Sequence, residues 1–125
     1  MVYSANYPTV LVVEDEPDLL AVIAGALRNG GFNVLAALSG TEAESYCAAS
    51  LQQIALVVLD FNLPGQNGLQ LAHSLSSRYP ALRFLFITGD LNAASSIAAE
   101  GWTCMTKPFS FDELVALVRA QVRSL

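Results

Sequence analysis

A continuous apolar run over residues 54–59 (IALVVL) ends directly at Asp60. Runs of this kind, without polar alternation, are typical of central parallel strands that helices cover on both faces. The run is far shorter than the roughly 20 apolar residues that cross a bilayer. It therefore predicts a buried strand of an α/β sheet that carries a carboxylate at its carboxyl end.

Four further short apolar runs alternate with stretches of helical period. Strands are predicted over 9–13, 32–37, 83–87 and 102–105. Helices are predicted from Pro17 to the Gly30-Gly31 pair, over 41–49, from Leu69 to before Pro80, and over 92–100. A capping box of Ser110 and Glu113 predicts the start of a last helix. That helix is expected to place Phe111, Leu114, Val115, Val118 and Val122 on one face.

Five strands alternating with five helices predict an α/β fold, a doubly wound five-stranded parallel sheet within a single domain over 1–125. In such sheets ligands lie outside the carboxyl ends of the strands. Four of the predicted strands end at polar residues, which we expect to share one rim: Glu14 and Asp15, Asp60, Thr88, and Lys107.

Charge and cysteine content exclude several classes of function. The net charge is −5 with only six Lys and Arg residues, so we expect no direct nucleic-acid binding. Residues 1–9 lack a cationic and apolar signal pattern, and no run is long enough for a membrane span, so we expect a cytoplasmic protein. Cys47 and Cys104 lie far apart, and His73 is the only histidine; the sequence predicts reduced, mostly buried thiols and no zinc site.

The acidic residues of the rim need a counter-charge if they converge. Two like charges about 4 Å apart repel by about 4 kcal/mol at an effective dielectric constant of about 20. Lys107, the only lysine in the chain, offsets one charge of the group Glu14, Asp15 and Asp60. A hard divalent cation with oxygen ligands offsets the rest, which favours Mg²⁺, with Mn²⁺ as a substitute.

A metal-bound carboxylate can act as a nucleophile toward phosphorus. Phosphoryl transfer then needs stabilisation of the charge on the equatorial oxygens. The Lys107 ammonium and the Thr88 hydroxyl are candidates for this role, beside the cation. Gly89 has no side chain, so a phosphoryl donor could approach beside Thr88.

Four motifs, in order and at matching spacing, resemble the receiver domain of two-component response regulators, the CheY-like family. They are VLVVEDEP (10–17), LVVLDFNLPGQNG (56–68), FITG (86–89) and TKPF (106–109). The resemblance covers essentially the whole chain. It implies the flavodoxin-like strand order 2-1-3-4-5.

The resemblance also implies roles for individual residues. Asp60 corresponds to the phosphoacceptor, with Thr88 and Lys107 as the switch hydroxyl and the phosphate-binding lysine. Glu14 and Asp15 correspond to the acidic pair, and Asp15 is the expected direct Mg²⁺ ligand. The remaining implied positions are the backbone carbonyl of Asn62 as a further metal ligand, and Asn62 and Asp90 as residues that tune hydrolysis of the acyl phosphate.

The resemblance implies a signalling phosphoacceptor rather than an enzyme with an external substrate. Its donor would be a phosphohistidine on a sensor histidine kinase or a histidine phosphotransfer protein. Self-phosphorylation from small phosphodonors and autodephosphorylation are implied as well. The phosphorylated form would change partner binding at the face of the fourth helix, fifth strand and fifth helix, toward a protein effector or an output domain outside this chain. His73 matches no donor position and is interpreted as an ordinary helix residue.

Two residues depart from the family pattern. Glu14 stands where Asp is frequent, so it is expected to act through water or a modest shift. Cys104 stands three residues before Lys107, where an aromatic switch residue is usual, and the nearest aromatic, Trp102, lies two residues earlier. A thiol has no aromatic ring that could reorient when Thr88 moves. The output surface is therefore expected to differ from that of family members with an aromatic residue at this position. A buried structural thiol and a redox role both remain open for Cys104.

Two other functions compete with the phosphoacceptor switch. A pseudo-receiver would keep the fold and bind a partner constitutively. Cys104, in place of the usual aromatic switch residue, is compatible with this function. A phosphatase of the haloacid dehalogenase class also uses an Asp nucleophile with Mg²⁺, but it would need a second acid where Asn62 stands. A nucleotide-binding P-loop is excluded, because no G-K-[ST] sequence occurs.

Overall fold

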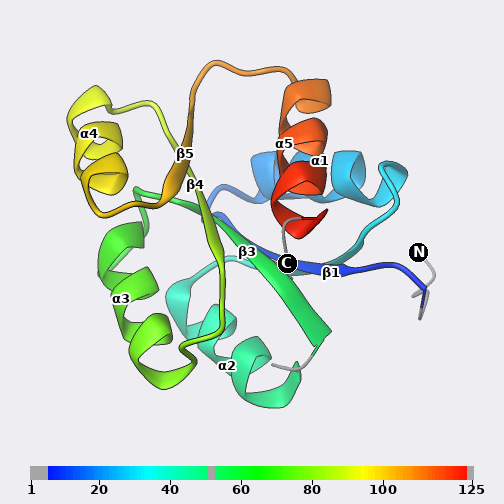
Figure 1. Cartoon of the computed structure of the whole chain (residues 1–125), viewed down its shortest axis with the longest axis horizontal. Helices are drawn as coiled ribbons and strands as arrows, with labels where there is room; N and C mark the ends of the chain where they lie inside the picture. Colours follow the sequence, from blue (N-terminus) through cyan, green and yellow to red (C-terminus); the bar gives the residue numbers. More distant parts are fainter. Residues whose placement is uncertain (1–5, 51–52, 124–125) are drawn as a thin grey trace.

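The computed structural model describes residues 6–50 and 53–123, so the ends of the predicted 1–125 domain lie outside the described residues. Five strands pair in parallel in the order β2-β1-β3-β4-β5, which confirms the predicted sheet (Figure 1). Their bounds are β1 Thr9–Val13, β2 Asn33–Ala37, β3 Ile54–Asp60, β4 Phe84–Thr88 and β5 Thr103–Thr106.

Helices cover both faces of the sheet, giving three layers (Figure 1). The helices are α1 Pro17–Asn29, α2 Gly40–Ser50, α3 Gly68–Arg78, α4 Leu91–Ala99 and α5 Phe111–Arg123. Buried side chains of α1 and α5 pack on one face, and those of α2, α3 and α4 on the other. This double cover explains why β1 is buried at all five positions and β3 at six of its seven.

Local sequence signals position the ends of the helices that flank the rim. Pro17 is the first residue of α1, and the Glu16 side chain before it accepts hydrogen bonds from the backbone N–H groups of Asp18 and Leu19. Gly31 follows the end of α1 with a φ of 96°, a conformation that glycine adopts without steric cost. The sequence interpretation of both helix ends is confirmed.

The structure corrects the predicted boundaries at several strands. Asp60 and Thr88 are the last residues of β3 and β4 rather than the residues after them, because both still pair in register with neighbouring strands. Phe32, Arg83 and Trp102 lie just before their strands. The carboxyl ends, which carry the polar residues, are therefore part of the rigid sheet.

The predicted apolar face of α5 is wrong at its first residue. Leu114 and Val118 are buried, but Phe111 is 36% exposed and makes an edge contact with Phe109, with ring centroids 5.9 Å apart. Phe111 opens the helix directly after its Ser110–Glu113 capping box, so its ring packs on the preceding loop and not on the sheet. The core contribution of α5 begins one turn later.

Candidate functional site

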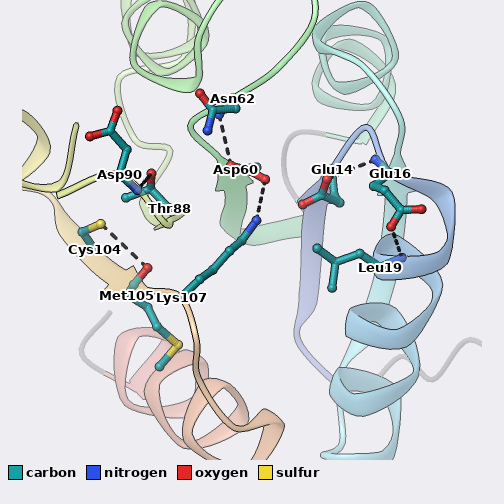
Figure 2. A network of polar contacts seen from close by, with 10 residues as sticks. All are labelled: Glu14, Glu16, Leu19, Asp60, Asn62, Thr88, Asp90, Cys104, Met105 and Lys107. Atoms are coloured by element: carbon teal, nitrogen blue, oxygen red, sulfur yellow. Dashed lines mark hydrogen bonds and ion pairs between the residues drawn. The ribbon is translucent and has the colours of Figure 1, made fainter. Parts of the chain in front are cut away.

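The Asp60 side chain lies at the centre of the rim and is held by two donors. Its Oδ1 atom accepts a hydrogen bond from the backbone N–H of Asn62 at 3.0 Å, and its Oδ2 atom pairs with Lys107 Nζ at 3.0 Å. Figure 2 shows Lys107 reaching from the end of β5 to Asp60 across the sheet rim. Asp60 is only 5% exposed, so both contacts act in a partly desolvated environment that strengthens them. The arrangement holds the Asp60 carboxylate in one orientation.

Three carboxylates converge at this point, as predicted. Glu14, Asp15 and Asp60 each offer an oxygen atom, and these atoms lie within 4.8 Å of one another. Glu14 is 3% exposed, whereas Asp15 is solvent-exposed. An all-oxygen donor set with more negative charge than one lysine offsets fits a hard divalent cation, which makes this cluster a candidate magnesium site.

The pKa of Glu14 reflects its burial and its position beside the other carboxyl groups of the cluster. Burial, followed by the neighbouring Asp60 carboxyl group, raises the pKa of Glu14 to about 7. The backbone N–H of Glu16, which donates to Glu14 Oε2 at 3.0 Å, and the charge of Lys107 act in the opposite direction and lower the pKa. Burial beside a second carboxyl group thus disfavours the ionised form of Glu14, which a nearby cation would favour.

Thr88 closes another side of the rim. Its side chain is fully buried, and its hydroxyl accepts a hydrogen bond from the backbone N–H of Asp90 at 3.0 Å. Its carbonyl accepts from the backbone N–H of Lys107 at 2.9 Å, so the ends of β4 and β5 are tied together. At Gly89, an added Cβ would meet Lys107 Cβ at 3.8 Å, an ordinary contact, so the protein's own packing does not require a glycine there.

The residue at the expected switch position lies beside this rim. Cys104 pairs in register with Phe86 on β4 and packs against the core cluster on the α2, α3 and α4 face. The sequence predicted mostly buried thiols: Cys47 is buried, whereas Cys104 is half-buried because β5 is the edge strand of the sheet. Burial raises the pKa of the Cys104 thiol, which disfavours the reactive thiolate at neutral pH.

The structure also brings together residues that the sequence interpretation treated separately. His73 Nε2 on α3 lies 2.8 Å from Glu100 Oε1 at the end of α4, and the His73 ring lies 5.2 Å from the Trp102 ring. Trp102 also contacts the rings of Phe84 and Phe86. These contacts join α3 to the end of α4 and give His73 no place in the rim. No local pattern could have indicated this contact, since it joins two helices distant in the sequence.

Gly68 is a site-supporting residue that the sequence interpretation passed over. It is the first residue of α3, and its backbone N–H donates to the Phe61 carbonyl at 2.6 Å. A Cβ at this position would collide with the Asp60 carbonyl oxygen and lie 3.0 Å from Phe61 Cα. The absence of a side chain therefore lets α3 pack directly against the backbone of the acceptor loop. The glycine that ends NLPGQNG was the available signal.

The fold and the rim define a class: a doubly wound α/β domain with one carboxylate between an acidic pair and a lysine. Comparison with known proteins identifies the family. The family model described as the response regulator receiver domain matches residues 10–119, and the chain belongs to this family of two-component signalling proteins.

Individual relatives agree with this assignment. The chain is 42% identical over 118 residues to a probable transcriptional regulatory protein, TcrX, of Mycobacterium tuberculosis, covering 92% of this chain and 50% of the relative. It is 36% identical over 116 residues to an uncharacterised transcriptional regulatory protein, YrkP, of Bacillus subtilis, covering 91% and 49%. The chain thus spans about half the length of these curated relatives.

Solved structures share the fold over almost the whole chain. A putative response regulator from Chloroflexus aurantiacus superposes with a TM-score of 0.85 at 28% identity, covering 94% of this chain and 99% of that one.

No helix among residues 6–50 and 53–123 has both the length and the apolar character needed to cross a membrane.

Proposed function

We propose that this chain is a phosphoacceptor switch of a two-component phosphorelay, in which Asp60 accepts the phosphoryl group. The observation that carries the proposal is the Asp60 carboxylate itself: nearly buried, oriented by Lys107 and the Asn62 N–H, and surrounded by oxygen ligands. These contacts hold the carboxylate in one orientation at the rim. They are what in-line attack on phosphorus requires.

The proposed reaction is a displacement at phosphorus. A carboxylate oxygen of Asp60 forms the new O–P bond while the P–N bond of the donor phosphohistidine breaks, and the electron pair stays on the departing imidazole. Lys107 then exchanges its partner from the carboxylate to a phosphoryl oxygen, and the Thr88 hydroxyl donates to another. Small phosphodonors would react in the same way, and water would later hydrolyse the acyl phosphate at a rate tuned by Asn62 and Asp90.

The cation proposed for this site is Mg²⁺, with Mn²⁺ able to replace it. Asp15 and Asp60 would bind it directly, Glu14 through water or a modest shift, and the Asn62 backbone carbonyl would complete the protein ligands. When bound, Mg²⁺ would neutralise charge that develops on the transferring group.

The wider setting is part of the proposal. The donor is a sensor histidine kinase or a histidine phosphotransfer protein, and the chain forms one cytoplasmic receiver domain over 1–125. The receiver would act on a protein effector or on an output domain beyond this chain, through the α4-β5-α5 face. The curated relatives, about twice as long as this chain, support an output domain. The sequence contains no cluster of Lys and Arg residues, so we propose no direct nucleic-acid binding by the receiver itself.

A constitutive pseudo-receiver is the second candidate, favoured by one observation. Cys104 supplies no ring at the position that usually reports the movement of the switch hydroxyl. The haloacid dehalogenase alternative receives no such support, because Asn62 stands where that class places its second acid.

Incubation with acetyl phosphate followed by intact mass spectrometry tests the proposal. The wild-type chain should gain one phosphoryl group with Mg²⁺ and none with a chelator, and Asp60→Ala should gain none. Asp112→Ala, which removes an exposed acid on α5, should behave as wild type. Absence of labelling in wild type, while a known receiver is labelled alongside, would favour the pseudo-receiver.

A further inference from the structure

We infer that the open edge of strand β2 binds an extended, apolar segment of a partner protein as an additional strand, in a groove between helices α1 and α2. The segment would carry a cationic side chain near Glu42 and an anionic side chain near Arg28. This inference goes beyond the proposed function, because it needs no phosphoryl group on Asp60.

Strand β2 forms one edge of the sheet. In the part of the chain that the structure describes, it pairs with β1 alone. The Asn33 N–H donates to the Pro8 carbonyl at 2.9 Å, on the side of β1. Backbone groups of successive residues in a strand point in opposite directions. Val34 and Ala36 therefore direct their N–H and C=O groups outward, away from β1.

Two charged side chains cover the ends of this edge and leave its middle open. Arg28 Nη2 donates to the Val34 carbonyl at 3.4 Å, and Glu42 Oε1 accepts from the Leu38 N–H at 2.7 Å. Between them, no described residue bonds to the outward N–H and C=O of Ala36. The strand sequence, NVLAA, contains neither proline nor a charged residue, the usual protections of an edge. Another strand can therefore pair with the middle of β2.

A groove of about 780 Å³ lies between α1 and α2 at this edge. Its volume falls within the roughly 300–1,000 Å³ of ligand-binding clefts. The two helices pack on opposite faces of the sheet, so a strand in the groove would contact α1 with alternate side chains and α2 with the others. Both sets should be apolar, because most of the lining is: Leu20, Ala21, Ala24, Ala36, Leu38 and Tyr46.

The charges at the two ends of the groove define the orientation of the segment. Neither Arg28 nor Glu42 forms an ion pair with another described residue. They bond to β2 at Val34 and Leu38, which are roughly 13 Å apart at about 3.3 Å per residue. Antiparallel pairing is the more stable kind per residue. It places the N-terminal end of the segment near Glu42 and its C-terminal end near Arg28, so the cation should come first in the sequence.

A single extended segment fits this edge better than a second copy of the chain does. A two-fold dimer would set the same surface of each copy against the other. Two grooves that face one another leave a space between them, whereas one strand fills a groove. The structure therefore favours a peptide segment as the occupant.

Fluorescence anisotropy with a labelled hexapeptide, fluorescein-Lys-Val-Leu-Ala-Val-Glu-amide, tests the inference. Its two charged residues lie on opposite faces of a strand, as Arg28 and Glu42 do on the sheet. The matched control is fluorescein-Glu-Val-Leu-Ala-Val-Lys-amide, which has the same composition. The first peptide should bind wild type about tenfold more tightly than the second, since two exposed ion pairs become two repulsions. The double variant Arg28→Glu, Glu42→Lys should reverse this preference.

Two further variants locate the binding site. Ala21→Phe adds a ring to the exposed α1 wall of the groove and should abolish binding. Ala116→Phe makes the same change at an exposed alanine of α5, outside the groove, and should bind as wild type does. On addition of the first peptide, amide hydrogen exchange should slow at Ala36, whose N–H would then donate to the added strand.

Several outcomes would overturn the inference. They are no binding of either peptide to wild type, equal binding of both, and full binding by Ala21→Phe. The comparison of the two peptides on wild type remains decisive if the double variant does not fold. A dimer in sedimentation that Ala21→Phe dissociates, without peptide binding, would assign the groove to a second copy instead. The assay contains no acetyl phosphate, so a failure of phosphorylation at Asp60 does not affect its result.

Discussion

At the scale of single residues, the rim depends on charges that the fold brings together at a free-energy cost. Glu14 is nearly buried beside Asp60, and its pKa is raised to about 7 by burial and by that neighbour. Groups with such shifted pKa values concentrate at functional sites, where burial and neighbouring like charges are brought together. The raised pKa of Glu14 is therefore a measurable property of the candidate cation site.

Replacement of Glu14 by Gln tests this property in chelator-treated protein. The folded protein favours the neutral acid, so ionisation of Glu14 destabilises the fold. Stability falls as pH rises from about 4.5 to about 7, and the effect of Glu14 then levels off because the group is ionised in both states. Glu14→Gln should then be more stable than wild type by about 1–3 kcal/mol at pH 8, with the difference vanishing below pH 4.5. Urea unfolding at the two pH values measures it. An equal difference at both pH values would show that packing, not charge, is responsible.

Gly68 gives a steric prediction at the same scale. Gly68→Ala forces a Cβ against the Asp60 carbonyl and the Phe61 backbone, which should destabilise the fold by about 1–3 kcal/mol and displace the acceptor loop. Gly25→Ala is the matched control, because it lies inside α1 with no atom within 4 Å of the added Cβ. That control should gain about 0.5–1 kcal/mol of stability. Equal effects of the two substitutions on unfolding would contradict the close approach at Gly68.

At the scale of helices and strands, capping motifs determine where several helices begin. The Ser110 hydroxyl accepts from the Glu113 N–H at 3.0 Å, and the Glu113 carboxylate accepts from the Ser110 N–H at 3.1 Å. A second capping box, Asn67 with Gln70, begins α3 directly after the acceptor loop. The two capping boxes fix the points at which the loops containing Asn62 and Lys107 end and the helices α3 and α5 begin.

The α5 capping box predicts a specific pH dependence. Bonds from Ser110 lower the pKa of Glu113, so its contribution to stability is present above the ordinary Glu pKa of 4.5 and is lost as pH falls through the lowered value. Glu113→Gln should therefore be less stable than wild type at pH 7 and equal to it at pH 3. Ser110→Ala should lose about 1 kcal/mol at pH 7. Thermal unfolding across this pH range checks both; a Glu113→Gln deficit that persists at pH 3 would contradict the carboxylate's role.

Most of the elements could be predicted because their signals are local. The run over 54–59 indicated β3, and Pro17 with Gly30-Gly31 indicated the ends of α1. Topological rules then placed Glu14, Asp60 and Lys107 at one rim. The pairing of His73 with Glu100 and the exposure of Phe111 could not be predicted, since they depend on how helices meet in three dimensions.

The hydrogen bond from Asp90 to Thr88 was also beyond the sequence. Asp before a helix predicts a cap, but nothing in the order of residues indicates that the same residue donates to Thr88. The geometry of the carboxyl ends of the strands supplies this information. The site residues were therefore predicted as a group, whereas the contacts among them came from the structure.

At the scale of the whole molecule, the strand order explains why one small domain can hold this site. Placing β1 and β3 side by side brings the acidic pair next to Asp60, and β4 and β5 add Thr88 and Lys107 from the other side. The α4-β5-α5 edge lies next to the last two strands, so a change at Thr88 is close to a surface that a partner could read (Figure 1). Under the proposed function, the phosphoacceptor site and the partner-binding face would thus occupy adjoining parts of the same sheet.

The central claim is that Asp60, and no other acid of the rim, receives the phosphoryl group. Borohydride reduction of the acetyl phosphate-treated chain, followed by peptide sequencing, identifies the modified residue, because an aspartyl phosphate is reduced to homoserine. We predict homoserine at position 60 alone, and only when Mg²⁺ was present. Homoserine at position 15 or 90, or none at all while a known receiver is modified in parallel, would contradict the account.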